Sequence, residues 1–111
     1  MGVVYSALDE QRAQQVALKF LTIRGERSES LRRFLRGARL ARSIKHKHIV
    51  RTLDFGVCNE AGDSAYLVMD LVRGVSLNAI DNAALSVGAR VGLVAQLLQA
   101  LAYMHARHIL H

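Results

Sequence analysis

A single lysine interrupts an apolar stretch near the start of the sequence. Residues 16–23 are VALKFLTI, and Lys19 is the only charged residue among them. An ammonium group that is buried without a partner loses its hydration at a high cost in free energy. Two interpretations are open. Lys19 points to solvent from an edge strand, or it faces a cleft and meets an anionic ligand or a buried carboxylate.

Basic residues give the chain a net charge of +6, and most of them lie between Arg24 and Arg51. Several arginines on one helix face can bind a polyanion such as nucleic acid. Few exposed aromatic residues are expected, however, and single-stranded nucleic acid is bound largely by stacking on such residues. We therefore interpret the arginines as a solvated helix face and expect no nucleic-acid partner.

Histidines are the other residues that could do chemistry. They fall in two groups: His46 and His48, and then His105, His108 and His111. A zinc-binding helix of the metalloprotease type pairs histidines at i and i+4, whereas these recur at intervals of two and three residues. The sequence therefore predicts no metal site.

Length and composition indicate one domain with a modest core, since the chain has 111 residues of which 51% are hydrophobic. No window reaches the ~18 uninterrupted apolar residues of a membrane helix, and no signal peptide is evident. Cys58 is the only cysteine, which predicts a reducing, cytoplasmic location and an inert thiol. The first residues, MGVVYS, match an acylation pattern, but we interpret them as a loop that leads into a strand and do not expect acylation.

Hydrophobic periodicity indicates an α+β fold with an antiparallel sheet. The predicted elements are strands at 3–8, 16–23, 48–57 and 65–72, a helix from Ser28 or Ser30 to Ile44, a short helix at 77–80 and a long helix at 88–110. The long helix carries an apolar stripe at helical spacing.

Five short motifs follow one another in an order that belongs to a known family. They are MGVVYSALD, VALKFL, RFLRGARLARSIKHKHIV, AYLVMDLVRGVSL and ALAYMHARHILH. The series resembles the small lobe of a protein kinase domain, most closely the bacterial Ser/Thr kinases of eukaryotic type. The resemblance implies a small lobe and hinge at 1–72, with the first strand missing, and the start of the large lobe at 73–111. In the family the long helix packs on parts that are not among these residues. Its apolar stripe would then be exposed, so we expect self-association or marginal solubility.

The resemblance also implies an ATP site, formed by Gly2, Val4, Ala17, Lys19, Met69, Asp70, Leu71 and Val72. Gly2 would be the last glycine of the loop that covers the phosphates, and Lys19 would pair with the α- and β-phosphates. Val4 and Ala17 would pack on the adenine.

The other members of this set correspond to the hinge of the family. Met69 would guard the back of the adenine pocket. Asp70 and Val72 would offer backbone hydrogen bonds to the adenine edge, with Leu71 between them.

Several parts of the family's catalytic apparatus are not among these residues. His111 resembles the first residue of the H-R-D sequence, but the catalytic aspartate, the D-F-G aspartate and the metal-binding asparagine are missing. We expect no metal ligands and no kinase activity from these residues alone, and a protein substrate only where a large lobe is supplied. The alternative is a non-catalytic, pseudokinase-like module that binds nucleotide or a partner.

A glycine interrupts the predicted arginine-rich helix at 37. The family has a glutamate there, in R-F-x-R-E-A, and that glutamate pairs with the strand lysine. Gly37 follows Phe34 by three residues and precedes Ala41 by four, so we expect it on the inward stripe of the helix. Glu29 is about 12 Å away along the helix axis and cannot replace the missing carboxylate. Even a completed kinase would then be impaired.

Overall fold

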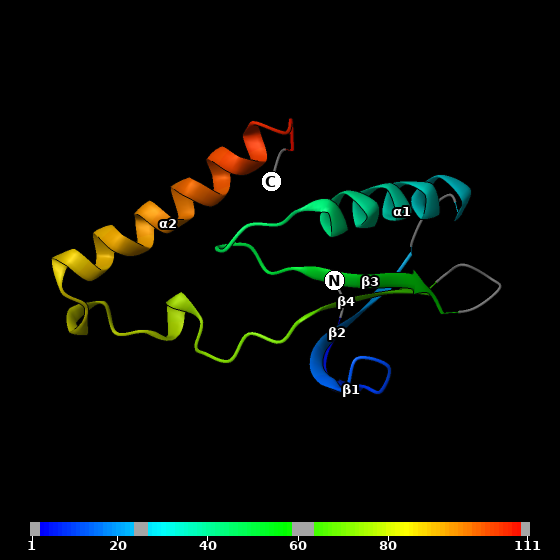
Figure 1. The fold of residues 1–111 in the computed structure, drawn as a ribbon, viewed down its shortest axis with the longest axis horizontal. Coiled ribbons are helices and arrows are strands. Elements are labelled where there is room, and N and C mark those ends of the chain that lie inside the picture. Colours follow the sequence, from blue (N-terminus) through cyan, green and yellow to red (C-terminus); the bar gives the residue numbers. More distant parts are fainter. Residues whose placement is uncertain (1–2, 24–26, 59–63, 110–111) are drawn as a thin grey trace. The chain divides into compact units, whose positions relative to one another are not determined.

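The computed structural model describes residues 3–23, 27–58 and 64–109 (Figure 1). The elements are β1 (Val3–Asp9), β2 (Gln14–Thr22), α1 (Arg27–Ser43), β3 (Thr52–Val57), β4 (Ser64–Asp70), the 3-10 turns η1 (Leu77–Ala79) and η2 (Asn82–Ala84), and α2 (Val87–His105). They fall into two compact units, residues 1–45 with 50–72, and residues 46–49 with 73–111.

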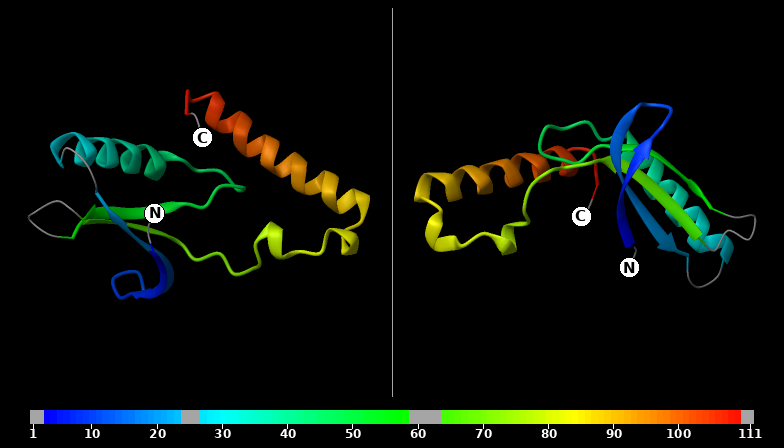
Figure 2. Two further views of the ribbon diagram at one scale, coloured as in Figure 1. Left: turned by 180° about the vertical axis from the view of Figure 1, so that it is seen from behind. Right: turned by 90° about the horizontal axis from the view of Figure 1, so that it is seen from below.

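The first unit is a four-stranded antiparallel sheet with α1 beside it, which confirms the α+β prediction. The strand order is β1-β2-β4-β3, so β2 and β4 are the inner strands. Each of these segments contains β-branched and aromatic side chains, which favour strands. The helix α1 contacts β3 at the edge of the sheet, as both views in Figure 2 show.

Small residues dominate the core of this unit. Ala65 in β4 is completely buried, and Val16 in β2 and Ala38 in α1 are nearly so. Ile44 follows the end of α1 and is also buried. The apolar stripe of α1 therefore faces the sheet, while its arginines lie outside, as amphipathic periodicity predicts.

The strand predicted at 48–57 begins later than expected, at Thr52. Residues 46–49 form a turn instead, in which Ile49 N donates to His46 O at 3.1 Å and His48 N donates to His46 Nδ1 at 3.2 Å. The imidazole bond gives the backbone a local alternative to a strand ladder. The prediction was also wrong at the end of β4, which stops at Asp70 rather than at residue 72.

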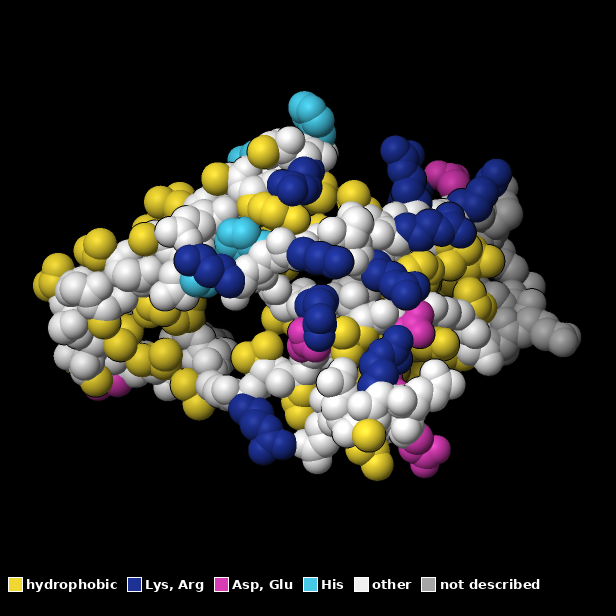
Figure 3. All heavy atoms as spheres, in the orientation of Figure 1, with side chains coloured by type: hydrophobic (Ala, Val, Ile, Leu, Met, Phe, Trp, Pro, Cys, Tyr) yellow, Lys and Arg dark blue, Asp and Glu magenta, His cyan; other side chains and the backbone are white. Residues whose placement is uncertain are grey.

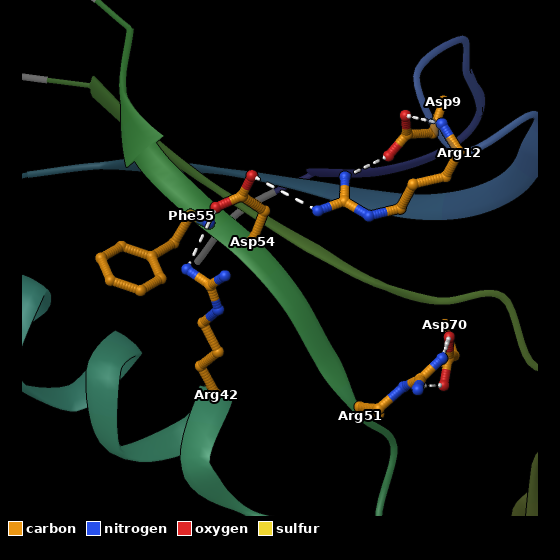
Figure 4. Close-up of polar contacts among 7 residues, drawn as sticks. All are labelled: Asp9, Arg12, Arg42, Arg51, Asp54, Phe55 and Asp70. Atoms are coloured by element: carbon orange, nitrogen blue, oxygen red, sulfur yellow. Dashed lines mark hydrogen bonds and ion pairs between the residues drawn. The ribbon is translucent and has the colours of Figure 1, made fainter.

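A chain of charged side chains links the β1–β2 turn to β3 and α1 (Figure 4). Arg12 binds Asp9 at 2.6 Å and reaches Asp54 at 3.8 Å, and Arg42 of α1 reaches the same Asp54 at 3.8 Å. Asp54 lies at the irregular point of the β3–β4 pairing and accepts a hydrogen bond from Phe55 N at 2.9 Å. The Asp54 carboxylate thus accepts a backbone hydrogen bond at the irregular point of β3 and also lies near two arginines from different elements.

The Asp9→Asn variant is expected to make stability less sensitive to acid. The Arg12 side chain, by hydrogen bonding, lowers the pKa of Asp9 below its usual 3.8. A carboxylate with a lowered pKa stabilises the fold above its unfolded pKa, and this contribution disappears as the pH falls through the folded pKa. The thermal midpoint of the variant should lie below that of the parent at pH 7, and the gap should close as the pH falls below 3.8. A gap of constant size at every pH would contradict the assignment.

The second unit consists of η1, η2, α2 and the turn at 46–49. Ser86 caps α2, because its hydroxyl accepts from Ala89 N at 3.1 Å. Near the end of the helix the Tyr103 ring lies 4.9 Å from His46, and Arg107 stacks over the same ring at 3.7 Å. Tyr103 therefore contacts both a histidine and a guanidinium.

One face of α2 is apolar and exposed. Its exposed residues are Val87, Val91, Val94, Leu97 and Leu98. Among the helices that the structure describes, α2 alone is long and apolar enough to cross a membrane by length and composition. A core helix of a soluble domain has the same composition, so this feature is weak evidence for a membrane span.

Candidate functional site

The strand register places four of the predicted site residues on one face of the sheet. Val4 in β1 lies opposite Lys19 in β2, and Ala17 in β2 lies opposite Met69 in β4. Residues directly opposite each other in an antiparallel pair project to the same face, and so do residues two apart on one strand. Val4, Ala17, Lys19 and Met69 therefore share one face across three strands.

The register also adds residues to this face that sequence reasoning missed. Leu67 lies opposite Lys19, and Thr52 lies opposite Met69 and is buried. Only the pairing of β4 with β2 and β3 reveals them, because Leu67 and Thr52 were assigned no role from any motif. The face thus offers a cation surrounded by aliphatic side chains, with one hydroxyl at its edge.

Lys19 does not lie on an edge strand. β2 pairs with β1 on one side and with β4 on the other, so the prediction that Lys19 lies on an edge strand is wrong. The residue is half-buried, and its ammonium lies within ion-pair distance of no carboxylate in residues 3–23, 27–58 and 64–109. An anionic ligand facing Lys19 therefore stays a prediction.

Gly37 lies outside the packed stripe of α1. The residue is exposed, and a Cβ added there would meet nothing within 4 Å. The prediction of an inward position was wrong, because the stripe is centred on Ala38 and position 37 is about 100° away from it around the helix. A longer side chain has room at this position.

The end of β4 is anchored through the side chain of Asp70. Arg51 donates from Nε and Nη2 to the two carboxylate oxygens, at 3.1 and 3.2 Å, and Asp70 N donates to Arg51 O at 3.0 Å (Figure 4). Asp70 pairs with Val16, so its carboxylate projects away from the face that carries Ala17 and Lys19. Sequence reasoning identified Asp70 but missed Arg51, which no motif marks.

The two residues after Asp70 have backbone groups without hydrogen-bond partners among the described residues. Val72 is 68% exposed, and neither it nor Leu71 forms a hydrogen bond with any residue that the structure describes. Two further predicted residues, Gly2 and His111, lie outside the described residues. Within the described ranges, no three His, Cys, Asp or Glu residues gather closely enough to hold a metal ion.

Comparison with known proteins decides the family. The sequence model of the protein kinase domain family matches residues 1–111, the whole of the chain. The chain belongs to the protein kinase domain family. Individual relatives agree, and they include "Serine/threonine-protein kinase pkn2" of Myxococcus xanthus, 35% identical over 113 residues, and "Serine/threonine-protein kinase PrkC" of Bacillus subtilis, 33% identical over 114 residues. "Serine/threonine-protein kinase PknA" of Mycobacterium tuberculosis is 33% identical over 116 residues.

The chain corresponds to only a portion of each of these relatives. The matches cover all of the chain but only 13%, 17% and 27% of the three relatives in turn. The chain is therefore a fragment of a Ser/Thr protein kinase domain, and the sheet with α1 is consistent with the small lobe of that domain.

Proposed function

We propose that this kinase fragment binds ATP on the face of the sheet that carries Lys19. The observation that supports the proposal is the shared face of Val4, Ala17, Lys19 and Met69, with no carboxylate partner for Lys19 among the described residues. An aliphatic surface suits a purine ring, and a single cation beside it suits a phosphate.

Each part of the nucleotide has a place in this arrangement. The adenine lies against Val4 and Ala17, with Met69 behind it. The backbone of Asp70 and Val72, with Leu71 between them, meets the adenine edge. Lys19 holds the α- and β-phosphates. Mg²⁺ supplies charge neutralisation when it is bound to the phosphates, and its protein ligands belong to parts of a kinase domain outside these residues.

Loss of Lys19 should abolish nucleotide-dependent stabilisation. A ligand that binds only the folded state raises apparent stability, by about 2.7 kcal/mol at a concentration of one hundred times Kd. MgATP or MgADP should therefore raise the thermal midpoint of the chain, and Lys19→Met should remove the shift. Lys47→Met removes a lysine elsewhere and is the matched control. A shift that survives in Lys19→Met would contradict the proposed site.

The proposed activity of the complete domain is phosphoryl transfer from ATP to protein serine or threonine. We further propose that a polypeptide of these 111 residues alone is inactive, because phosphoryl transfer needs the catalytic aspartate and the metal-binding residues. Mg²⁺-dependent phosphorylation of a generic protein substrate by the purified chain would contradict this.

A pseudokinase-like binding module is the second candidate, and Gly37 favours it. Without the helix glutamate, Lys19 lacks the partner that positions it in active kinases. Nucleotide binding without restored catalysis, in a polypeptide that contains a complete large lobe, would support this candidate.

Self-association is proposed through the exposed face of α2. Val91 and Val94 are 62% and 55% exposed, and such apolar surface tends to be covered by a second chain. We also propose that the chain is cytoplasmic. In light scattering its apparent mass should exceed the monomer mass of 12.3 kDa, and the double variant Val91→Ser with Val94→Ser should lower that mass toward the monomer value. A monodisperse monomer with a cooperative thermal transition would argue against this.

A further inference from the structure

Positive charge is concentrated in one part of the chain. Residues 27–51 contain nine lysines and arginines and a single acidic residue, Glu29. Their formal charge is +8, whereas the rest of the chain carries −2. Figure 3 shows the dark blue side chains gathered over α1.

Two arginines in the middle of this basic segment make no contact that stabilises the fold. Arg33 binds Glu29 at 2.5 Å and Arg42 reaches Asp54, so both serve the structure. Arg36 and Arg39 are exposed and form no ion pair or hydrogen bond with any residue in the part of the chain that the structure describes. Like charges three residues apart on a helix repel each other, so this pair weakens α1.

An exposed leucine lies beside these arginines. Leu40 is 42% exposed and follows Arg36 by one helical turn and Arg39 by one residue. Arginines at positions 36 and 39 are about 4.5 Å apart along the helix axis. Protein–protein interfaces commonly combine apolar side chains with a polar border, and they are enriched in arginine.

The residue types distinguish between the anions that could bind here. α1 contains six arginines and no lysine, and arginine forms two parallel hydrogen bonds to a carboxylate where lysine forms a point contact. Interfaces between proteins are enriched in arginine and depleted in lysine. The described residues around Leu40 on α1 include no exposed aromatic side chain on which a nucleic-acid base could stack.

We propose that Arg36, Arg39 and Leu40 form a docking surface for an acidic segment of a protein. The segment places an apolar side chain on Leu40 and carboxylates on the two guanidinium groups. The surface lies on the outer side of α1, so docking does not depend on the proposed nucleotide site.

The test measures binding of a fluorescein-labelled peptide of glutamates with one central leucine, by fluorescence anisotropy at physiological salt. Arg36→Glu with Arg39→Glu should weaken binding about tenfold, because charge reversal replaces attraction by repulsion. Lys47→Glu with Arg73→Glu changes the net charge equally but lies off α1, and it should change binding less than twofold or so. Equal losses in the two double variants would overturn the proposal.

Further measurements separate the alternatives. Leu40→Ser should weaken binding of the leucine-containing peptide but not of an all-glutamate peptide; equal effects on both would contradict the apolar contact. If the charge-reversed variant fails to fold, as judged by circular dichroism, Arg36→Gln with Arg39→Gln replaces it. This variant should weaken peptide binding by a smaller factor. Tighter binding of a single-stranded oligonucleotide or of phosphatidylserine vesicles than of the peptide would overturn the choice of partner. Lys19→Met should bind the peptide normally.

Discussion

Replacing Gly37 by glutamate is expected to raise kinase activity about tenfold or more, because a positioned lysine lowers the barrier more than a mobile one. The measurement needs a polypeptide in which these residues are joined to the large lobe of a related Ser/Thr kinase. The observable is kcat/KM for ATP, which reports transition-state stabilisation. Gly37 is exposed beside the packed stripe of α1, so the pairing requires the longer glutamate side chain to reach Lys19 from there. A Cβ at position 37 would meet nothing within 4 Å, which leaves room for that side chain to extend.

Two controls separate the carboxylate from its side effects. Gly37→Ala should stabilise the chain by roughly 1 kcal/mol, because glycine in a helix interior is unfavourable, but it should leave activity unchanged. Gly37→Gln has the length of glutamate without its charge and should also leave activity low. If the parent with Gly37 is already as active as the Gly37→Glu variant, the pairing argument fails for this protein.

Replacing Gly56 by alanine is expected to destabilise the first unit by about 1–2 kcal/mol, because an added methyl group overpacks the sheet. Gly56 in β3 lies opposite Tyr66 in β4, and the tyrosine ring covers it. A Cβ at this position would lie 2.6 Å from Tyr66 Oη and 2.7 Å from Cζ. The tyrosine ring must therefore move away from Gly56, and it then no longer packs over the β3–β4 pair.

Denaturant unfolding of the variant measures this effect. Gly74→Ala is the matched control, since a Cβ at Gly74 meets nothing within 4 Å and stability should change little. A double-mutant cycle with Tyr66→Ala tests the cause, because removing the ring should cancel most of the cost of the methyl group. Additive effects of the two substitutions would show that Tyr66 is not responsible.

Periodicity was sufficient to predict the four strands and the two α-helices, but not all of their limits: α2 ends at His105 rather than at residue 110, and the turn η2 was not predicted. The apolar run in VALKFL and the helical spacing in the arginine-rich segment predicted β2 and α1, because these patterns follow directly from backbone geometry. The start of β3 was wrong by four residues, since the imidazole of His46 hydrogen-bonds the backbone of His48 and holds a turn there. A single side-chain bond of this kind leaves no periodic trace.

The candidate site divides in the same way. Lys19 was found because a charge in an apolar strand demands a reason, and the motif order predicted the kinase family, which the comparison confirmed. Gly37 was expected on the packed stripe and is exposed, because the stripe is narrow and centred on Ala38. The roles of the site residues toward ATP stay predictions.

The sequence by itself determined the residue types, their order and the periodicity of the strands and of α1, because these depend on neighbours along the chain. Only the tertiary structure decided that β2 is an inner strand, that Leu67 and Thr52 join Lys19 and Ala17 on one face, and that Arg51 holds Asp70. The physical reason is that strand order and register arise from contacts between segments far apart in the chain, and hydrophobic pattern leaves those pairings open.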